Sequence, residues 1–196
     1  MRIEIVVFDG FDEIDAIGPF EVLSSAGFDV TLVGVEKADI VVSQRGVRLD
    51  VAAALGTPEG VIVPGGGWLD RAPEGSWAQA QRGTLAAKLL LVSASAHWLA
   101  SVCTGGMLLA TAGLLTGRFA TTNRNALEEF RPFVGTVIDE RVVDDGDRIT
   151  AAALTAGLDL GLWITERELG TEAADRVSVS LEYPRQGRVW RAPPRH

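Results

Sequence analysis

Two short segments of this 196-residue chain are almost entirely apolar, and each runs directly into glycines. They read GVIVPGGG at residues 60–67 and WLASVCTGG at residues 98–106. Short runs rich in Val, Ile and Leu are typical of strands buried on both faces of a sheet, and helices must then cover both faces. We therefore expect an α/β fold with a mostly parallel central sheet.

The rest of the sequence supplies the alternation of helices and strands that such a fold needs. The acidic sequence DDGD (144–147), between two apolar segments, predicts a β-hairpin. Further strands are predicted at 2–8, 29–35 and within 40–51, and helices at 17–28, 76–90, 104–115, 155–170 and 171–180. No internal repeat or linker divides the chain, so we expect a single domain over 1–183 and a short, mobile C-terminal tail over 184–196.

Composition narrows the partners and the location. The formal net charge is −8 and the basic residues are scattered, whereas nucleic-acid binding requires a clustered positive surface. No apolar run approaches the 18 or so residues of a transmembrane helix, and the N-terminal run is too short for a signal peptide. A lone cysteine cannot form an intramolecular disulfide. The expectation is a cytoplasmic protein without nucleic-acid or membrane partners.

That lone cysteine, Cys103, stands where the second apolar segment meets a predicted helix of small residues. A strand, a nucleophilic side chain and a helix in immediate succession are the pattern of a nucleophile elbow, which lifts the side chain above the end of the sheet. A helix N-terminus favours the thiolate, whereas a free thiol with a pKa of about 8.5 is mostly protonated at pH 7. The competing interpretation is a buried structural cysteine.

The glycines at 65–67 are a second candidate, because they follow the other buried segment. Backbone N–H groups in such a turn can face a developing negative charge, as an oxyanion hole does. Two alternatives stay open at this point. A phosphate-binding loop would need a Lys-Ser/Thr pair that the sequence lacks, and an ordinary glycine turn needs nothing further.

Nucleophilic chemistry also needs a proton carrier, and the sequence favours a carboxylate over a histidine. His97 lies six residues before Cys103, roughly 20 Å away along an extended strand, and His196 is the last residue. A standard cysteine protease is therefore disfavoured. The acidic residues that could serve, or could simply cap a helix, are Asp12, Glu13, Asp15 and Glu21.

Metal ions and cofactors are not expected. One cysteine and two histidines do not make up a common zinc cluster. The spacing of the carboxylates does not favour an all-carboxylate site either, although it does not exclude one.

Four blocks taken together resemble the ThiJ/PfpI superfamily, in order over residues 1–183. They read DAIGPFEV, VIVPGGGW, SVCTGGMLLATAGLLTGRFATTN and ITAAALTAGLDLGLWI. The resemblance implies a flavodoxin-like three-layer sandwich of the class I glutamine amidotransferase type, and a homodimer. The motifs D-x-x-G-P, P-G-G and S-V-C-T-G are similar to those of the isonitrile hydratases within this superfamily. Those enzymes add water to an isonitrile and form an N-substituted formamide.

The resemblance also implies roles for particular residues. Cys103 takes the position of the nucleophile, and Asp15 takes that of the general acid and base. Thr104 becomes a polar contact beside the nucleophile. Gly66 and Gly67 would offer backbone donors facing the thiol. The substrate would be a small isonitrile in a mostly apolar pocket.

Other readings of the same motifs remain open. Protease-like and glyoxalase-like branches commonly have histidine directly after the cysteine, where this chain has Thr104, and Asn123 stands where relatives often have histidine. Trp68 is a candidate for the pocket wall. The alternatives are an oxidative-stress sensor based on Cys103 and another Cys-dependent hydrolase or lyase. A regulator of the AraC type is disfavoured, because we expect no helix-turn-helix domain after the last motif.

Overall fold

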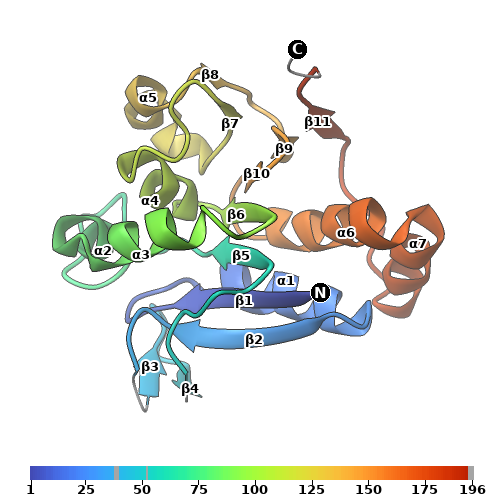
Figure 1. The fold of residues 1–196 in the computed structure, drawn as a ribbon, viewed down its shortest axis with the longest axis horizontal. Coiled ribbons are helices and arrows are strands. Elements are labelled where there is room, and N and C mark those ends of the chain that lie inside the picture. The colour runs from blue at the N-terminus through green and yellow to red at the C-terminus, as the bar shows by residue number, and fades with distance from the viewer. Residues whose placement is uncertain (38–39, 52, 194–196) are drawn as a thin grey trace.

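The computed structural model describes residues 1–37, 40–51 and 53–193, and a seven-stranded sheet runs through its centre (Figure 1). From one edge to the other the strands are β11 (Val189–Arg191), β9 (Val142–Asp144), β10 (Arg148–Ala151), β6 (Trp98–Val102), β5 (Gly60–Val63), β1 (Arg2–Val7) and β2 (Asp29–Gly34). Every neighbouring pair is parallel except β9 and β10. The predicted α/β fold with a mostly parallel sheet is confirmed.

The two apolar segments form the middle of this sheet. Every residue of β5 and β6 is buried, which is the burial that their almost entirely apolar sequences predict. Ile62 of β5 lies beside Ile5 of β1, and Val63 lies beside Ser101 of β6. The carboxyl ends of these three parallel strands therefore meet at one edge of the sheet.

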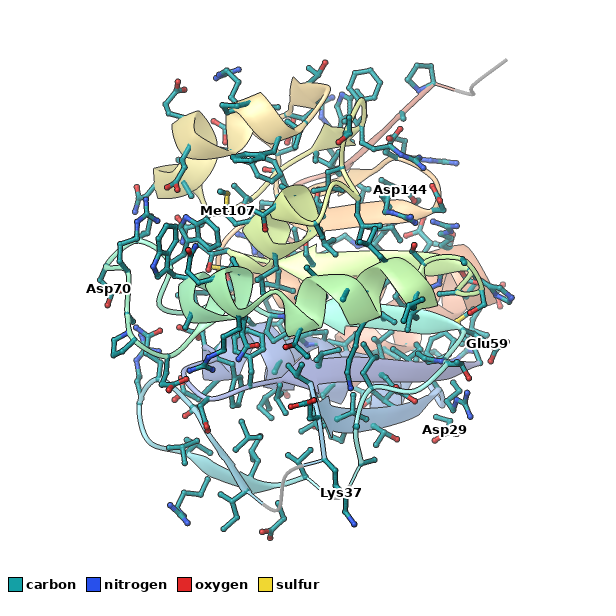
Figure 2. The ribbon with its side chains drawn as sticks, turned by 60° about the vertical axis from the view of Figure 1, so that its left-hand side comes forward. Asp29, Lys37, Glu59, Asp70, Met107 and Asp144 are labelled. Atoms are coloured by element: carbon teal, nitrogen blue, oxygen red, sulfur yellow. The ribbon has the colours of Figure 1, made fainter. Side chains whose placement is uncertain are left out.

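Helices cover both faces and complete the three-layer sandwich. One group in mutual contact contains α1 (Glu13–Ser25), α6 (Ala156–Leu169) and α7 (Thr171–Ser180); the other contains α2 (Ser76–Arg82), α3 (Thr84–Val92) and α4 (Gly105–Thr111). Figure 2 shows the second group, in green, in front of the strands. The two groups lie on opposite faces because right-handed crossovers from β1 to β2 and from β5 to β6 step in opposite directions along the sheet.

Small elements decorate this core. The short strands expected within 40–51 form a hairpin of β3 (Ile40–Val42) and β4 (Arg48–Asp50). The hairpin expected around 144–147 is the antiparallel β9–β10 pair. The remaining pieces are β7 (Phe119–Ala120), β8 (Thr136–Val137), α5 (Leu127–Phe130) and the 3₁₀ turns Arg124–Ala126 and Arg131–Phe133. Among the residues described, no helix is long and apolar enough to cross a membrane.

The first helix begins four residues earlier than the sequence pattern predicts. Asp12 caps it, since its side chain accepts a hydrogen bond from the Ile14 N–H at 3.3 Å. Pro19 would lie in the first turn of a helix over 17–28, but it lies in the interior of α1. The shift matters for the site, because it places Asp15 inside the first turn of the helix.

Two other boundaries differ from the prediction. The helix expected over 76–90 is two helices, α2 and α3, because Gly83 has a left-handed φ of 74° that ends one and begins the other. The C-terminal segment, which we expected to be mobile, contributes β11 to the main sheet. Trp190 of β11 packs against Phe119 with ring centroids 4.9 Å apart, so the strand also has an apolar contact. His196 lies outside the described residues.

Candidate active site

The candidate site lies where β1, β5 and β6 end, at the end of the molecule where Figure 2 labels Asp70. Asp15 follows the first of these strands, the glycine turn at 65–67 follows the second, and Cys103 follows the third. A pocket of about 220 Å³ opens beside them. The edge of a parallel sheet at the carboxyl ends of its strands is where open α/β folds bind ligands.

Cys103 sits in a strained elbow. Its φ is +55°, a left-handed value that a residue with a side chain rarely adopts. Its backbone N–H donates to the Ala152 carbonyl at 2.9 Å, and its carbonyl accepts from the Thr122 hydroxyl at 2.7 Å. The side chain is only 5% exposed. The nucleophile elbow predicted from the sequence is therefore present, and hydrogen bonds on both sides hold it.

The elbow fits because Gly105, the first residue of α4, has no side chain. A Cβ there would lie 2.0 Å from the Val63 carbonyl oxygen at the end of β5. The close approach of these two backbones brings the glycine turn against Cys103 and Thr104. Any larger residue at position 105 would force the two strand ends apart.

Gly105→Ala is expected to destabilise the fold by about 2 kcal/mol or more, since the added methyl group has no room. Gly18→Ala is the matched control. The Cβ at position 18 would come no closer than 3.6 Å to its nearest neighbour, Leu158, which is an ordinary van der Waals contact, and alanine favours a helix over glycine. Urea denaturation of both variants tests this expectation, and equal stabilities would contradict it.

Asp15 lies fully buried beside Cys103. Its Oδ2 accepts a hydrogen bond from the Gly65 N–H at 3.0 Å, while Oδ1 makes no hydrogen bond of normal geometry. Burial, and then the negative charge of Asp12, raise the pKa of Asp15 to about 8; donation from Gly65 and from the Cys103 thiol opposes this rise. At neutral pH this carboxyl is therefore mostly protonated.

The pKa of the Cys103 thiol differs from the expectation drawn from its position at a helix N-terminus. Burial, and then the negative charge on Asp15, raise the pKa of Cys103 to about 12. α4 has only seven residues, and its N-terminus does not overcome the removal of the sulfur from water. The resting site therefore holds a neutral thiol beside an acid, and any thiolate must form by proton transfer within the pair.

Thr104 holds the glycine turn through a closed ring of hydrogen bonds. The Gly66 N–H donates to Thr104 Oγ1 at 3.0 Å, and the Ser76 hydroxyl donates to the Gly66 carbonyl at 2.8 Å. The two hydroxyl oxygens are 3.1 Å apart. Because the Ser76 proton is already used, the Thr104 hydroxyl donates to Ser76. Thr104 thus has no proton left for a substrate.

This ring changes the expected donor pair. The Gly66 N–H is occupied by the Thr104 hydroxyl, whereas no hydrogen bond among the described residues engages the Gly67 N–H. Both glycines line the pocket. Ser76, which completes the ring from α2, was not singled out in the sequence. Only the folded structure shows this contact, since nothing in the sequence SWAQAQR indicates that Ser76 holds a loop ten positions earlier.

The pocket is less apolar than expected. Trp68 belongs to its wall, as does the exposed side chain of Leu69. The remaining lining is largely polar or charged: Asp12, Gln44, Arg45, Asp70, Thr104 and Asn123, with Leu154 and Cys103. A small substrate with some polar character fits this lining.

The other acidic candidates do not reach the cysteine. Asp12 caps α1 and forms an ion pair with Arg45 at 2.9 Å. Glu13 also binds Arg45, and the hydroxyl of Ser43. Glu21 accepts a hydrogen bond from Ser25 on the helix surface. Of the four acids, only Asp15 can exchange a proton with the thiol.

His97 precedes β6 at the amino ends of the central strands, on the side away from the candidate site, where its backbone N–H donates to the Glu59 carbonyl. No group of three or more His, Cys, Asp or Glu residues within the described ranges could hold a metal ion.

Asn123 is the remaining polar side chain beside the sulfur, since its Nδ2 donates to Sγ at 3.2 Å. The sequence pattern gave no role to this residue.

Comparison with known proteins places the fold and the candidate site in a family. The sequence pattern of the DJ-1/PfpI family matches residues 1–167. The chain belongs to this family. An isonitrile hydratase of Pseudomonas putida is 31% identical over 192 residues, which cover 93% of this chain and 78% of that protein. A deglycase of Pyrococcus abyssi is 28% identical over 171 residues, covering 85% of this chain and 96% of that protein.

Solved structures agree on the fold. A ThiJ/PfpI family protein from Pseudomonas syringae superposes with a TM-score of 0.83 at 29% identity, covering 95% of this chain and 76% of that one. The recognition of the ThiJ/PfpI superfamily from the four sequence blocks is confirmed. Family membership by itself does not choose a reaction, because relatives with quite different activities share it.

Proposed function

We propose that this protein is an isonitrile hydratase, which adds water to R–N≡C to give the formamide R–NH–CHO. The observation that carries the proposal is the buried pair of Asp15 and Cys103, which provides a nucleophile and one proton carrier in contact. The similarity to the hydratase of Pseudomonas putida supports the choice of substrate.

In the first step the terminal carbon of the isonitrile accepts both a nucleophile and a proton. Ionised Asp15 takes the proton from the Cys103 thiol as Sγ bonds to the carbon. Asp15 then delivers that proton to the same carbon, which gives the thioimidate R–N=CH–S–Cys103. One S–H bond breaks, one C–S bond and one C–H bond form, and Asp15 returns to its carboxylate.

In the second step water attacks the thioimidate carbon. Asp15 takes a proton from the water and passes it to the sulfur as the C–S bond breaks, and the second water proton ends on nitrogen. The products are the formamide and the Cys103 thiol. The high pKa of Asp15 suits this role, because a strong acid would not take protons back readily.

The direct test is an ultraviolet assay of the purified, reduced protein with para-nitrophenyl isocyanide. We expect formation of the corresponding formamide, with a rate proportional to protein concentration. Folded protein that leaves the isocyanide unchanged would reject the proposed activity.

The pH dependence of kcat/KM provides a further prediction. The active form of the pair has lost one proton, so the rate should rise about tenfold per pH unit up to pH 8 and level off above it. Asp12→Asn keeps the helix cap but removes the charge that raises the pKa of Asp15, so its midpoint should move to lower pH. A profile that is flat from pH 6 to 9 would contradict this assignment.

The sensor alternative has less support from the site. Oxidation by peroxide starts from the thiolate, and the Cys103 thiol is buried with a raised pKa. The homodimer implied by the family resemblance stays a prediction, as does the division into a domain over 1–183 and a C-terminal segment.

A further inference from the structure

Asn123 is the only side chain that donates a hydrogen bond to the cysteine sulfur among the contacts of the described residues. It is half-buried, precedes the 3₁₀ turn Arg124–Ala126 and reaches Cys103 Sγ with its Nδ2 at 3.2 Å. The Gly66 N–H and the Thr104 hydroxyl are engaged with each other, as described above, so the Asn123 amide is the side-chain donor that joins the backbone N–H groups of Thr104 and Leu154 near the sulfur.

The orientation of the amide is fixed. Asn123 Oδ1 accepts the backbone N–H of Asn125 at 2.9 Å, which caps the 3₁₀ turn. If the amide were flipped, its NH₂ group would face that N–H, and two donors would meet. The NH₂ group is therefore directed to the sulfur whatever the protonation state of the thiol.

We infer that Asn123 is a catalytic residue that stabilises negative charge on the Cys103 sulfur. The inference rests on the proposed function for the steps in which it acts. The sulfur carries charge when its proton moves to Asp15, and again when the C–S bond of the thioimidate breaks. An N–H donor lowers the energy of both states.

The amide also directs the thiol proton. Asn123 offers the sulfur a donor and no acceptor, because Oδ1 is occupied. The S–H bond must then point toward another group, and Asp15 is the buried acceptor beside it. An amide cannot titrate near neutral pH, so Asn123 holds the sulfur without competing with Asp15 for its proton.

The test is the alkylation rate of Cys103 by iodoacetamide, followed by intact mass. Cys103 is the only cysteine, so each added mass reports on this site alone. Three variants are compared with the wild type at pH 8.5. Asn123→Leu keeps the bulk and removes the donor. Asn123→Asp keeps the shape and the cap. Asn125→Ala changes a neighbouring exposed side chain but retains the N–H that orients Asn123.

We expect alkylation of Asn123→Leu to be roughly ten- to hundredfold slower, as for the loss of a hydrogen bond to a charged group. Asn123→Asp should be slower still, because a carboxylate faces the forming thiolate, and Asn125→Ala should match the wild type. Alkylation of folded Asn123→Leu and Asn123→Asp at the wild-type rate would overturn the inference.

Isonitrile turnover separates this inference from the proposed function. A wild-type protein that does not hydrate isonitriles, with slowed alkylation in Asn123→Leu, removes the hydratase but supports the role of Asn123 in stabilising the thiolate. Normal hydration with unchanged alkylation and unchanged kcat in Asn123→Leu removes the role of Asn123 alone.

Discussion

Replacement of Cys103 by alanine or serine is expected to abolish isonitrile hydration, with kcat falling at least about a thousandfold. The reason is specific to the reaction: without the sulfur no thioimidate can form, and the Thr104 hydroxyl, which also lines the pocket, is engaged with Gly66 and Ser76. Serine keeps the shape but holds its proton too tightly for Asp15 to remove. The ultraviolet assay measures the loss directly.

His97→Asn is the control for this experiment. His97 is exposed, precedes β6 at the end of the strand far from the site, and its backbone N–H donates to the Glu59 carbonyl, so the variant should keep full activity. Formamide production by folded Cys103→Ala at more than a few per cent of the wild-type rate would rule out a covalent mechanism through this residue.

Asp15→Asn is expected to reduce hydration by roughly a hundred- to ten-thousandfold, the range of a lost general acid and base. The same variant should be more stable than the wild type. Burial raises the pKa of Asp15 to about 8 in the folded protein, while the unfolded chain has an ordinary value near 4. Asparagine has nearly the same shape and never has to hold a buried charge.

The direction in which stability changes with pH follows from proton linkage. Between pH 4 and 8 the folded state holds a proton on Asp15 that the unfolded state has released, so the wild type loses stability as the pH rises through this window. The loss is at most about 1.4 kcal/mol per pH unit. Urea denaturation at pH 5 and pH 8 should show the advantage of Asp15→Asn growing with pH. A constant difference would mean that Asp15 titrates normally in the folded protein.

The loss of activity and the gain of stability expected for Asp15→Asn have one origin. Placing a carboxyl and a thiol together away from water destabilises the folded state, and in the proposed mechanism the same placement lets the two groups exchange a proton. The strained φ of Cys103 has the same character, because it persists only while the surrounding hydrogen bonds impose it. A site with neither feature would be more stable and chemically inert.

Much of the fold could be read along the chain, because it depends on local pattern. Residues 60–63 and 98–102 are almost entirely apolar, and this pattern predicts strands buried on both faces of a parallel sheet. The hairpin at 144–147 follows from its turn residues. The helix break at Gly83 and the strand at 189–191 were missed. The helix break depends on a single backbone angle at Gly83, and the C-terminal strand pairs with a strand nearly fifty residues away.

The candidate site divides in the same way. Cys103 and the glycine turn are marked in the sequence, because a strand followed by small residues is a local signal. Their environment is not marked. The neutral thiol, the ring that Ser76 closes and the Asn123 amide facing the sulfur each depend on groups that only the packed sheet brings together.

The sequence by itself therefore determined the class of fold, the position of the candidate nucleophile and the strand ends at which the candidate site lies, since these follow from the periodicity and order of nearby residues. The family resemblance had singled out Asp15, but only the tertiary structure decided that this acid lies buried beside the cysteine, which protonation states the pair adopts and which side chains donate to it. Burial and distance set those properties, and both are created when β1, β5 and β6 pack side by side.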